Sequence, residues 1–269
     1  MPSAGNNGAA AVTSGACRRE ALAYRQLLPF SPIRFPSPYL VELADDGAAN
    51  FVLEDLGAQR AVDQMEGLEP DDCLAATAAL ARFHRHWPQP AGYAKLNVRR
   101  AAPATIPLAA LTEGLAALRE RWSSVLDSTQ LTAFEQLVKR RDRVIEAFVR
   151  AEPVTLCHGD PRADNMVFAA DGIPILFDWQ QVALQFGAAD VAWLAATSLT
   201  SSVRRRLDSD LADTYGTSMD RYRLGFVLPG LAVLLLAQRE VDDERTARFV
   251  ATSLERIATA LVDLDVARI

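Results

Sequence analysis

The sequence predicts an α+β fold in which a few short strands accompany a large helical part. Strand-like apolar runs are short and fall in two regions, 39–56 and 154–177. Apolar residues at helical spacing dominate 58–150 and the chain after residue 190. Strands and helices therefore do not alternate along the chain, which argues against a parallel sheet with helical crossovers.

The composition narrows the class of protein further. Half of the 269 residues are hydrophobic, enough for one large core or two unequal ones. The net charge is −6, whereas a general nucleic-acid binder carries a basic surplus, so we expect no nucleic-acid partner. The longest apolar stretch, 224–237, contains Pro229 and Gly230 and is too short to span a bilayer, so we expect no membrane partner. Three scattered cysteines without a CxxC pair favour a reducing cytoplasm over a disulfide framework.

One helix and two strands are expected in the N-terminal part. Small residues fill 1–16 and predict a loop or tail. Helical spacing begins near Cys17 and stops at Pro29. The apolar runs 39–43 and 51–56 flank an Asp-Asp-Gly turn signal, so they predict an antiparallel pair.

Helices are expected between the two strand regions and again after the second. Asp71 and Asp72 suit the N-cap of the first helix. Amphipathic spacing in 112–122 and 131–149 predicts two more. From Asp190 onward the pattern is helical to the end of the sequence.

The segment 154–179 predicts a buried strand, a polar loop and a β-hairpin, in this order. The strand is 154–157, the loop is 158–165, and the hairpin strands are 166–168 and 173–177. Asp171-Gly172 is a strong signal for a two-residue turn. A turn at these two positions places Asn165 opposite Asp178 at the open end of the hairpin.

This register brings an amide oxygen and a carboxylate together. Pro174 falls opposite Ala169 at a non-hydrogen-bonded position, where its missing N–H costs the ladder nothing. One Asn and one Asp are too few for an all-protein cation cage, but they suit Mg²⁺ whose shell phosphates and waters complete. Asp160 precedes them in the loop and is placed to accept a proton from a hydroxyl that attacks a phosphate, and Arg162 could contact the transferred group.

The loop and hairpin resemble a known catalytic arrangement. HGDPRADN, 158–165, is similar to the H-x-D-x-x-x-x-N loop of the protein-kinase-like superfamily, in the form of the aminoglycoside phosphotransferase and choline kinase-like family. FDW, 177–179, resembles that family's counterpart of the D-F-G metal site. The resemblance implies that Asp160 is the catalytic base and that Asn165 and Asp178 hold Mg²⁺.

Weaker parts of the resemblance lie nearer the N-terminus of the sequence. FVLEDLG, 51–57, resembles the hinge strand between the two lobes of the family's fold. The backbone around Glu54, Asp55 and Leu56 is then expected to hydrogen-bond the adenine of ATP. With these parts, the similarity covers roughly residues 17–200.

Four further residues gain implied roles. RREALAYRQL, 18–27, resembles the N-lobe helix whose Glu pairs with a phosphate-binding lysine, which implies that role for Glu20. His158 is expected to brace the loop, and Arg162 stands where protein kinases carry a catalytic-loop lysine. Asp190 is expected to anchor the loop.

The resemblance implies a protein-kinase-like fold with a truncated small N-lobe at 1–57. A large, mostly helical C-lobe at 58–269 would hold the catalytic loop, the metal site and the acceptor pocket. The family's Gly-rich loop and lysine should precede the Glu20 helix, but the two lysines, Lys95 and Lys139, lie past the hinge. Either the start codon is assigned too far downstream, or the protein is truly truncated and binds ATP poorly. We favour a misplaced start, because strands without their neighbours expose an edge and an apolar face.

The implied function is ATP-dependent transfer of the γ-phosphoryl group to a hydroxyl of a small molecule, with ATP and Mg²⁺ as cofactors. A catalytically impaired pseudokinase or binding module is the alternative, because the Gly-rich loop and lysine are absent. A metal-dependent phosphohydrolase is disfavoured, since it needs more than the three His residues supply. Sugar, choline-like, sterol-like and antibiotic acceptors stay open. Acidic residues in 58–150 and 195–269 could suit a cationic amino sugar, but this signal is diffuse. The oligomeric state does not follow from the sequence.

Simpler interpretations exist for several polar residues. Glu20 could be a surface glutamate, and Arg162 could form a structural salt bridge. His84 and His86 are two residues apart on a predicted helix and therefore face different sides, which argues against a metal pair. Cys157 ends a predicted strand and should point away from its histidine neighbour, which argues against a nucleophile pair.

Overall fold

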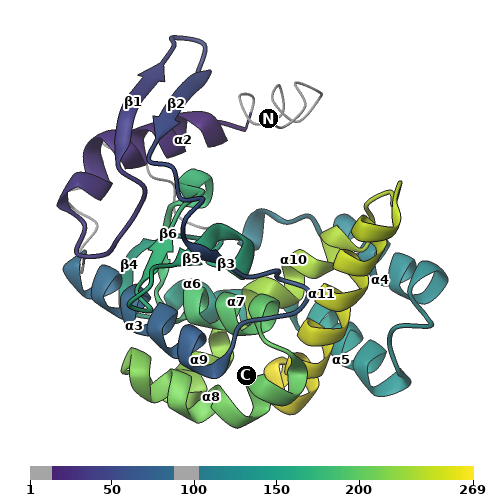
Figure 1. The fold of residues 1–269 in the computed structure, drawn as a ribbon. Coiled ribbons are helices and arrows are strands. Elements are labelled where there is room, and N and C mark those ends of the chain that lie inside the picture. The colour runs from purple at the N-terminus through teal and green to yellow at the C-terminus, as the bar shows by residue number, and fades with distance from the viewer. Residues whose placement is uncertain (1–13, 88–102) are drawn as a thin grey trace.

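The computed structural model of the protein describes residues 14–87 and 103–269. Its α+β architecture confirms the predicted fold class, with small sheets and a predominance of helix. Residues 1–13 of the predicted tail and Lys95 lie outside the described residues. Figure 1 shows α2, β1 and β2 at one end of the molecule, with the hairpin strands and the large helical part below them.

Helices and strands occupy the following residues. The α-helices are α2 (Ala16–Leu22), α3 (Pro70–His86), α4 (Leu108–Arg121), α5 (Ser128–Lys139), α6 (Arg141–Arg150), α7 (Ala188–Ser198), α8 (Ser201–Tyr215), α9 (Met219–Gly225), α10 (Val227–Leu236) and α11 (Glu244–Asp263). The strands are β1 (Pro38–Leu43), β2 (Ala49–Leu53), β3 (Arg60–Ala61), β4 (Val154–Cys157), β5 (Met166–Phe168), β6 (Pro174–Leu176) and β7 (Ala183–Phe186).

The strands form three small antiparallel sheets, β1–β2, β3–β5–β6 and β4–β7. The predicted antiparallel pair near the N-terminus is β1–β2, and the predicted hairpin is β5–β6. The first sheet exposes the apolar side chains of Tyr39, Leu40 and Val52. This agrees with the apolar surface expected for two strands that have no further strand partner within 14–87 and 103–269.

The N-terminal helix continues beyond α2. A π-helical turn covers Ala23–Leu27, and a 3₁₀ turn covers Leu28–Phe30. Pro29 lies in this last turn, where a proline is tolerated because the first N–H groups of a turn have no internal partner. The ring of Tyr24 packs against that of Phe51 at 5.9 Å between centroids, which fixes the helix on β2.

The start of α3 corrects the predicted N-cap. The helix begins at Pro70, after Glu69 at the cap position, and not at Asp71 or Asp72. Proline is favoured at the first helical position. The two aspartates occupy the first turn, where negative charge is favourable. Arg60 binds the carboxylate of Asp72 at 2.6 and 2.9 Å.

The predicted single helix over 131–149 is also wrong. It is two helices, α5 and α6, separated at Arg140, whose backbone has φ −101° and ψ 13°. The reason lies in tertiary packing, since α5 packs on α4 and α11 whereas α6 packs on α9 and β7. Neither proline nor glycine marks the break, so the sequence offers no local signal for it.

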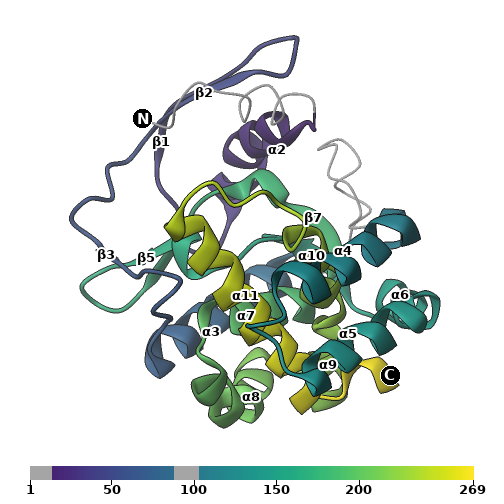
Figure 2. The ribbon, with the colours of Figure 1, turned by 90° about the vertical axis from the view of Figure 1, so that its right-hand side faces the viewer.

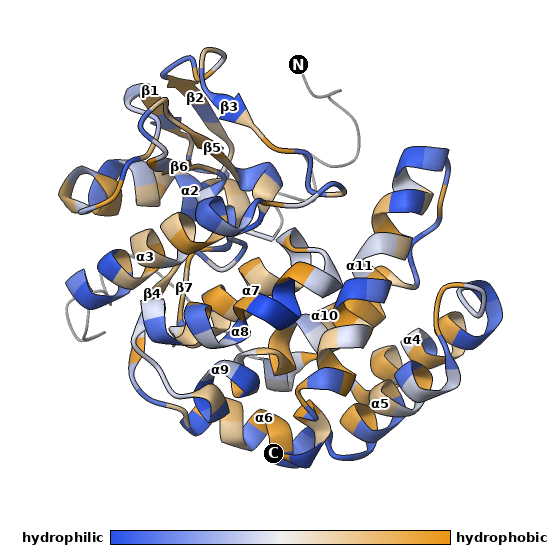
Figure 3. Ribbon diagram, turned by 60° about the horizontal axis from the view of Figure 1, so that its bottom comes forward, coloured by the Kyte–Doolittle hydropathy of each residue, from blue (hydrophilic) through white to orange (hydrophobic). Residues whose placement is uncertain are grey.

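The core of the helical part is built around α7. All residues of this helix are buried except the half-buried Trp193. Figure 3 shows its hydrophobic turns toward the middle of the helical part, and Figure 2 shows α11 lying across this part beside α10. Among the helices of the described residues, none combines the length and apolarity needed to cross a bilayer.

Candidate functional site

The polar loop 158–165 leaves β4 and is fixed at its start by α7. The carboxylate of Asp190, which is fully buried, accepts the backbone N–H of His158 at Oδ2 (2.7 Å). Its Oδ1 accepts the backbone N–H of Gly159 (3.1 Å). The expected anchoring of the loop by Asp190 is therefore confirmed.

Two side chains complete the surroundings of Asp190. The Nε2–H of His84 donates to it over 3.2 Å, and the amide of Gln185 donates over 3.0 Å. Together with the two backbone groups, these donors satisfy both carboxylate oxygens. His84, Cys157 and Asp190 lie within 4.8 Å of one another, but this cluster is explained as the loop anchor without a metal ion.

His158 braces the loop against the segment that follows the hairpin. Its Nε2–H donates to the carbonyl of Phe177 (3.0 Å), and its Nδ1 accepts the backbone N–H of Asp160 (3.3 Å). Its ring packs on that of Trp179 at 4.5 Å. Burial lowers the pKa of His158, which agrees with a neutral imidazole that donates on one side and accepts on the other.

Gly159 allows the loop to pass close to the chain after the hairpin. Its φ is +86°, in the left-handed region that glycine adopts most readily. A Cβ atom at this position would lie 2.2 Å from the carbonyl oxygen of Gln181. The loop path therefore requires a residue without a side chain.

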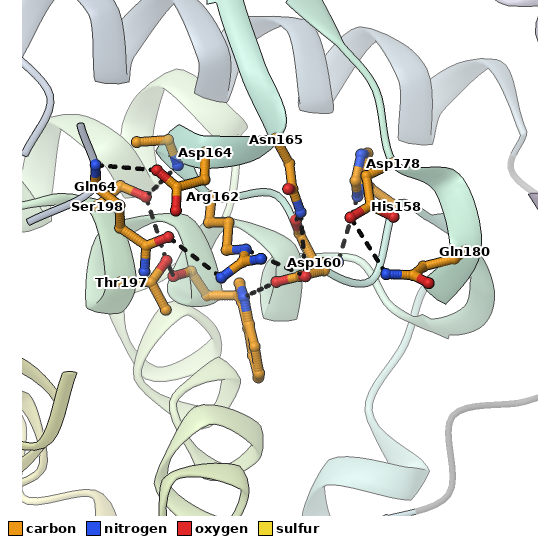
Figure 4. A network of polar contacts seen from close by, with 12 residues as sticks. Gln64, His158, Asp160, Arg162, Asp164, Asn165, Asp178, Gln180, Thr197 and Ser198 are labelled. Carbon is orange, nitrogen blue, oxygen red and sulfur yellow. Dashed lines mark hydrogen bonds and ion pairs between the residues drawn. The ribbon is translucent and has the colours of Figure 1, made fainter. Parts of the chain in front are cut away.

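Asp160 lies at the centre of a hydrogen-bond network (Figure 4). Its Oδ1 accepts the indole N–H of Trp193 (2.8 Å). Its Oδ2 accepts the amide N–H of Asn165 (3.1 Å) and lies 3.4 Å from Nε of Arg162. Burial raises the pKa of Asp160 to about 6, although Arg162, Trp193 and Asn165 favour its ionised form.

Sequence reasoning missed Trp193. The residue lies three positions after Asp190 on α7, so both side chains project from one face of the helix toward the loop. The predicted anchor was therefore the signal that could have identified it. The amide Nε2 of Gln180, which was also missed, donates to Oδ2 of Asp178 (3.3 Å).

The hairpin register differs from the predicted one by one residue. The observed pairs are Met166–Leu176, Val167–Ile175 and Phe168–Pro174. The turn has three residues, 170–172. The N–H of Ala169 donates to the carbonyl of Ile173, and the N–H of Gly172 donates to the carbonyl of Ala169. Gly172 has φ +78°, as such a turn requires at its last position. Pro174 still occupies a non-hydrogen-bonded position, because the preceding pair is hydrogen-bonded.

The corrected register still brings Asn165 and Asp178 to the open end of the hairpin. Asn165 faces Phe177, whose N–H donates to its carbonyl (3.0 Å), and Asp178 follows directly. Asn165 is 3% exposed, and its amide nitrogen is held by Asp160. Its side-chain oxygen is thus the atom left for a cation. Asp178 has φ 61° and ψ 63°, a strained backbone of a kind that clusters at functional sites.

Glu20 reaches the same place from α2, which packs on the turn 179–181. Burial, and then the charge of Asp178, raise the pKa of Glu20 to about 7, while the backbone N–H of Trp179 favours its carboxylate. The hydroxyl of Tyr24, close to both acids, is buried and has no hydrogen-bond partner among the described residues. Within 14–87 and 103–269, no Lys or Arg forms an ion pair with Glu20 or Asp178. This concentration of oxygen groups fits a bound divalent cation.

The expected hinge, Glu54 to Leu56, follows β2. The N–H of Glu54 donates to the carbonyl of Ser37 (2.8 Å), and Asp55 Oδ1 accepts the N–H of Gly57 (2.9 Å). In the described part of the chain, no residue pairs with the carbonyl of Glu54 or the N–H of Leu56. The carbonyl of Glu54 can thus accept one hydrogen bond and the N–H of Leu56 can donate one, which fits the hydrogen-bonding edge of a purine base.

A cavity of about 250 Å³ lies beside Asp160, between the loop and helices α7, α10 and α11. Arg162 lines it and donates to the side-chain carbonyl of Gln64 (3.5 Å). A larger cavity, of about 520 Å³, is lined by His84, Tyr215 and their neighbours. We assign the smaller cavity to the candidate site, because the larger one contains neither Asp160 nor the hairpin end.

The comparisons agree with this geometry. A model described as the phosphotransferase enzyme family matches residues 9–224. Among curated proteins, no sequence matches this chain.

Solved structures with the same fold include three of interest. The amicoumacin kinase hAmiN, in complex with AMP-PNP, Ca²⁺ and Ami, has a TM-score of 0.59 and 16% identity, over 90% of this chain and 77% of that one. The GDP complex of wild-type aminoglycoside 2′-phosphotransferase-IIIa has a TM-score of 0.59 and 13% identity, over 94% and 83%. A choline/ethanolamine kinase family protein from Mesorhizobium loti has a TM-score of 0.58 and 16% identity, over 92% and 84%. The fold is therefore the protein-kinase-like fold of these phosphotransferases.

Proposed function

Because the chain belongs to the phosphotransferase enzyme family, we propose that it moves the γ-phosphoryl group of ATP to a hydroxyl of a small molecule. The observation that carries this proposal is the meeting of Asp160, Asn165 and Asp178 at one end of the hairpin. The solved relatives named for kinase activity or a bound nucleotide support it at the level of the fold.

Asp160 is the proposed catalytic base. Burial raises its pKa to about 6, which suits a group that takes up a proton near neutral pH. It lines the cavity next to the loop, and two hydrogen bonds and Arg162 fix its carboxylate. In the proposed step the acceptor oxygen forms a bond to the γ-phosphorus, and the bond from that phosphorus to the β–γ bridging oxygen breaks. The acceptor proton goes to Asp160, and ADP leaves.

Asn165 and Asp178 are the proposed Mg²⁺ ligands, with Glu20 beside them. The ion would neutralise charge on the phosphates of ATP. The buried hydroxyl of Tyr24, which has no partner in the part of the chain that the structure describes, and the two adjacent acids support a cation there. The pairing of AMP-PNP with Ca²⁺ in the amicoumacin kinase complex supports a nucleotide with a divalent ion.

The remaining assignments complete the proposal. Arg162 contacts the transferred phosphoryl group, His158 positions the loop, and the backbone of Glu54, Asp55 and Leu56 binds adenine. We place the N-lobe at 1–57 and the C-lobe at 58–269. The pairing of β3 with β5 supports this boundary, because the chain joins the hairpin sheet directly after the hinge. The cysteine pattern supports a cytoplasmic location.

A nucleotide-binding protein without transfer activity is the second candidate. The observation that favours it is Glu20, whose implied lysine partner has no counterpart among the described residues. Such a protein would bind ATP weakly and release no phosphorylated product.

Calorimetry of ATP binding, with and without Mg²⁺, tests the nucleotide site. We expect binding that requires Mg²⁺ and weakens at least about tenfold in Asp178→Ala, because one of two proposed ligands is lost. Product formation with hydroxyl acceptors then separates the two candidates. Transfer that disappears in Asp160→Asn, with ATP binding retained, supports the kinase. Mg²⁺-independent binding, or none by the folded chain, would overturn the proposed site.

A further inference from the structure

The cavity beside Asp160 has a distinctive lining. Its apolar wall comes from α10 and α11, through Pro229, Ala232, Val233, Leu236, Phe249 and Ile257. Among the described residues, its charged side chains are those of Asp160, Arg162 and Arg239. The lining therefore carries one carboxylate and two guanidinium groups.

The two arginines differ in what they bind. The Arg162 guanidinium lies 3.4 Å from the carboxylate of Asp160 and donates to Gln64 over 3.5 Å. Arg239 is exposed, and no described residue forms a hydrogen bond or ion pair with its guanidinium. Its contacts are those of its backbone, whose N–H donates to Leu236 and whose carbonyl accepts from Arg121. Among the described charged residues that line the cavity, Arg239 is therefore the one whose side chain is available to a ligand.

A second cavity of about 250 Å³ continues from Arg239 and Phe249. It contains two acids, Asp63 and Asp164, but both carboxylates already accept backbone N–H groups. Asp63 Oδ1 accepts from Met65 (2.8 Å), and Asp164 Oδ1 accepts from Gln64 (3.2 Å). These acids hold the segment after β3 in place, and the second cavity sets their two negative charges against the guanidinium groups of Arg239 and Arg245.

We propose that the acceptor is a small, largely apolar alcohol that carries an anionic group such as a carboxylate. Its hydroxyl lies at Asp160, its body contacts the α10–α11 wall, and its anion binds Arg239. This inference rests on the proposed phosphotransferase function and deepens it. A polycationic amino sugar would set ammonium groups against an apolar wall and two guanidinium groups, which opposes its binding.

Three probes that share one hydroxyl test this acceptor class. They are 4-(hydroxymethyl)benzoate, 4-(hydroxymethyl)benzamide and 4-(hydroxymethyl)benzylamine, which differ in the charge opposite the alcohol. Binding to the full chain with Mg²⁺ and a non-hydrolysable ATP analogue is measured by NMR titration. Phosphorylated product with ATP is measured separately by mass spectrometry.

We expect the carboxylate to bind about fivefold more tightly than the amide, as an exposed ion pair allows, and the amine to bind most weakly. Arg239→Glu should invert the order of carboxylate and amine. Arg248→Glu makes the same charge change on an exposed residue of α11 outside both cavities and should leave the order unchanged.

The outcomes separate this inference from the function on which it rests. If the carboxylate probe binds but no phosphorylated product forms, phosphoryl transfer is contradicted, while the proposed class of ligand is still supported. Product formed preferentially from the amine, or a preference for the carboxylate that survives Arg239→Glu, overturns the inference and leaves the kinase standing. Absence of binding by all three probes overturns the inference as well.

Discussion

Gly159 and Gly172 share a left-handed backbone but differ in what surrounds them. A Cβ at Gly159 would lie 2.2 Å from a carbonyl oxygen, whereas one at Gly172 would have no atom within 4 Å. We expect Gly172→Ala to lower the free energy of unfolding by about 1 kcal/mol, the cost of the backbone conformation alone. Gly159→Ala should cost about 3 kcal/mol or more, because the loop must also move. Urea denaturation measures both, and equal losses would show that the close approach to Gln181 is not a constraint.

His158 predicts how stability depends on pH. Its pKa is lowered by burial from the ordinary 6.5, so below that pH the unfolded chain binds a proton that the folded chain does not. The free energy of unfolding should then fall with falling pH, by up to about 1.4 kcal/mol per pH unit from this group. The difference between the wild type and His158→Gln, measured from pH 7 to pH 5.5, isolates the effect. Parallel profiles for the two proteins would contradict it.

At the scale of residues, sequence reasoning reached the contacts that are local. Asp160 and Asn165 belong to one short loop, so their meeting could be predicted from their spacing. Trp193 contributes from α7 and Arg239 from the chain between α10 and α11, both far from the loop in the sequence. The spacing of Trp193 from Asp190 is a usable signal, whereas Arg239 has no such spacing. The roles assigned to these residues stay predictions until the variants are measured.

At the scale of elements, the errors have a common cause. The hairpin was predicted from its strongest two-residue turn signal, but Gly172 accommodates a three-residue turn that shifts the register by one. The helix over 131–149 was predicted from its periodicity, which continues through Arg140 although packing against different partners divides it. Local patterns therefore gave the existence of these elements, while tertiary contacts determined their register and ends.

Asp190 joins two elements, α7 and the polar loop, and its replacement should affect both. In Asp190→Asn, an amide N–H₂ faces groups that are themselves donors, so at least one buried donor loses its partner. We expect the free energy of unfolding to fall by about 3 kcal/mol and phosphoryl transfer to fall with it. Asp210→Asn, at an exposed position on α8, is the matched control. A stable Asp190→Asn variant with unchanged activity would show that the anchor is dispensable.

At the scale of the whole molecule, the α+β class and the helical excess could be predicted, because both follow from patterns summed over long stretches. The cavity beside Asp160 could not, since its walls come from α7, α10 and α11 and the chain near Gln64. Its lining also differs from the diffuse acidic character of 58–150 and 195–269, which could have suited a cationic acceptor among several open classes. Net charge describes the entire surface, whereas a few side chains determine the charge of one cavity.

Mg²⁺ and ATP should together stabilise the molecule. At a ligand concentration of about 100 times Kd, binding to the folded state alone adds about 2.7 kcal/mol to the free energy of unfolding. We expect the melting temperature to rise with Mg²⁺ and ATP together, to rise less with ATP and EDTA, and to lose this difference in Asp178→Ala. An equal rise with EDTA would show that the nucleotide binds without a metal ion.

The anchoring of the loop by α7 has a consequence for how the molecule unfolds. Because α7 lies at the centre of the core, the loop cannot keep its conformation once the core opens, and the core cannot lose this helix while the loop stays ordered. Denaturant should therefore abolish the proposed phosphoryl transfer and tryptophan burial in one cooperative transition. Residual activity in an assay of the proposed transfer would then report directly on the fraction of molecules whose core is intact.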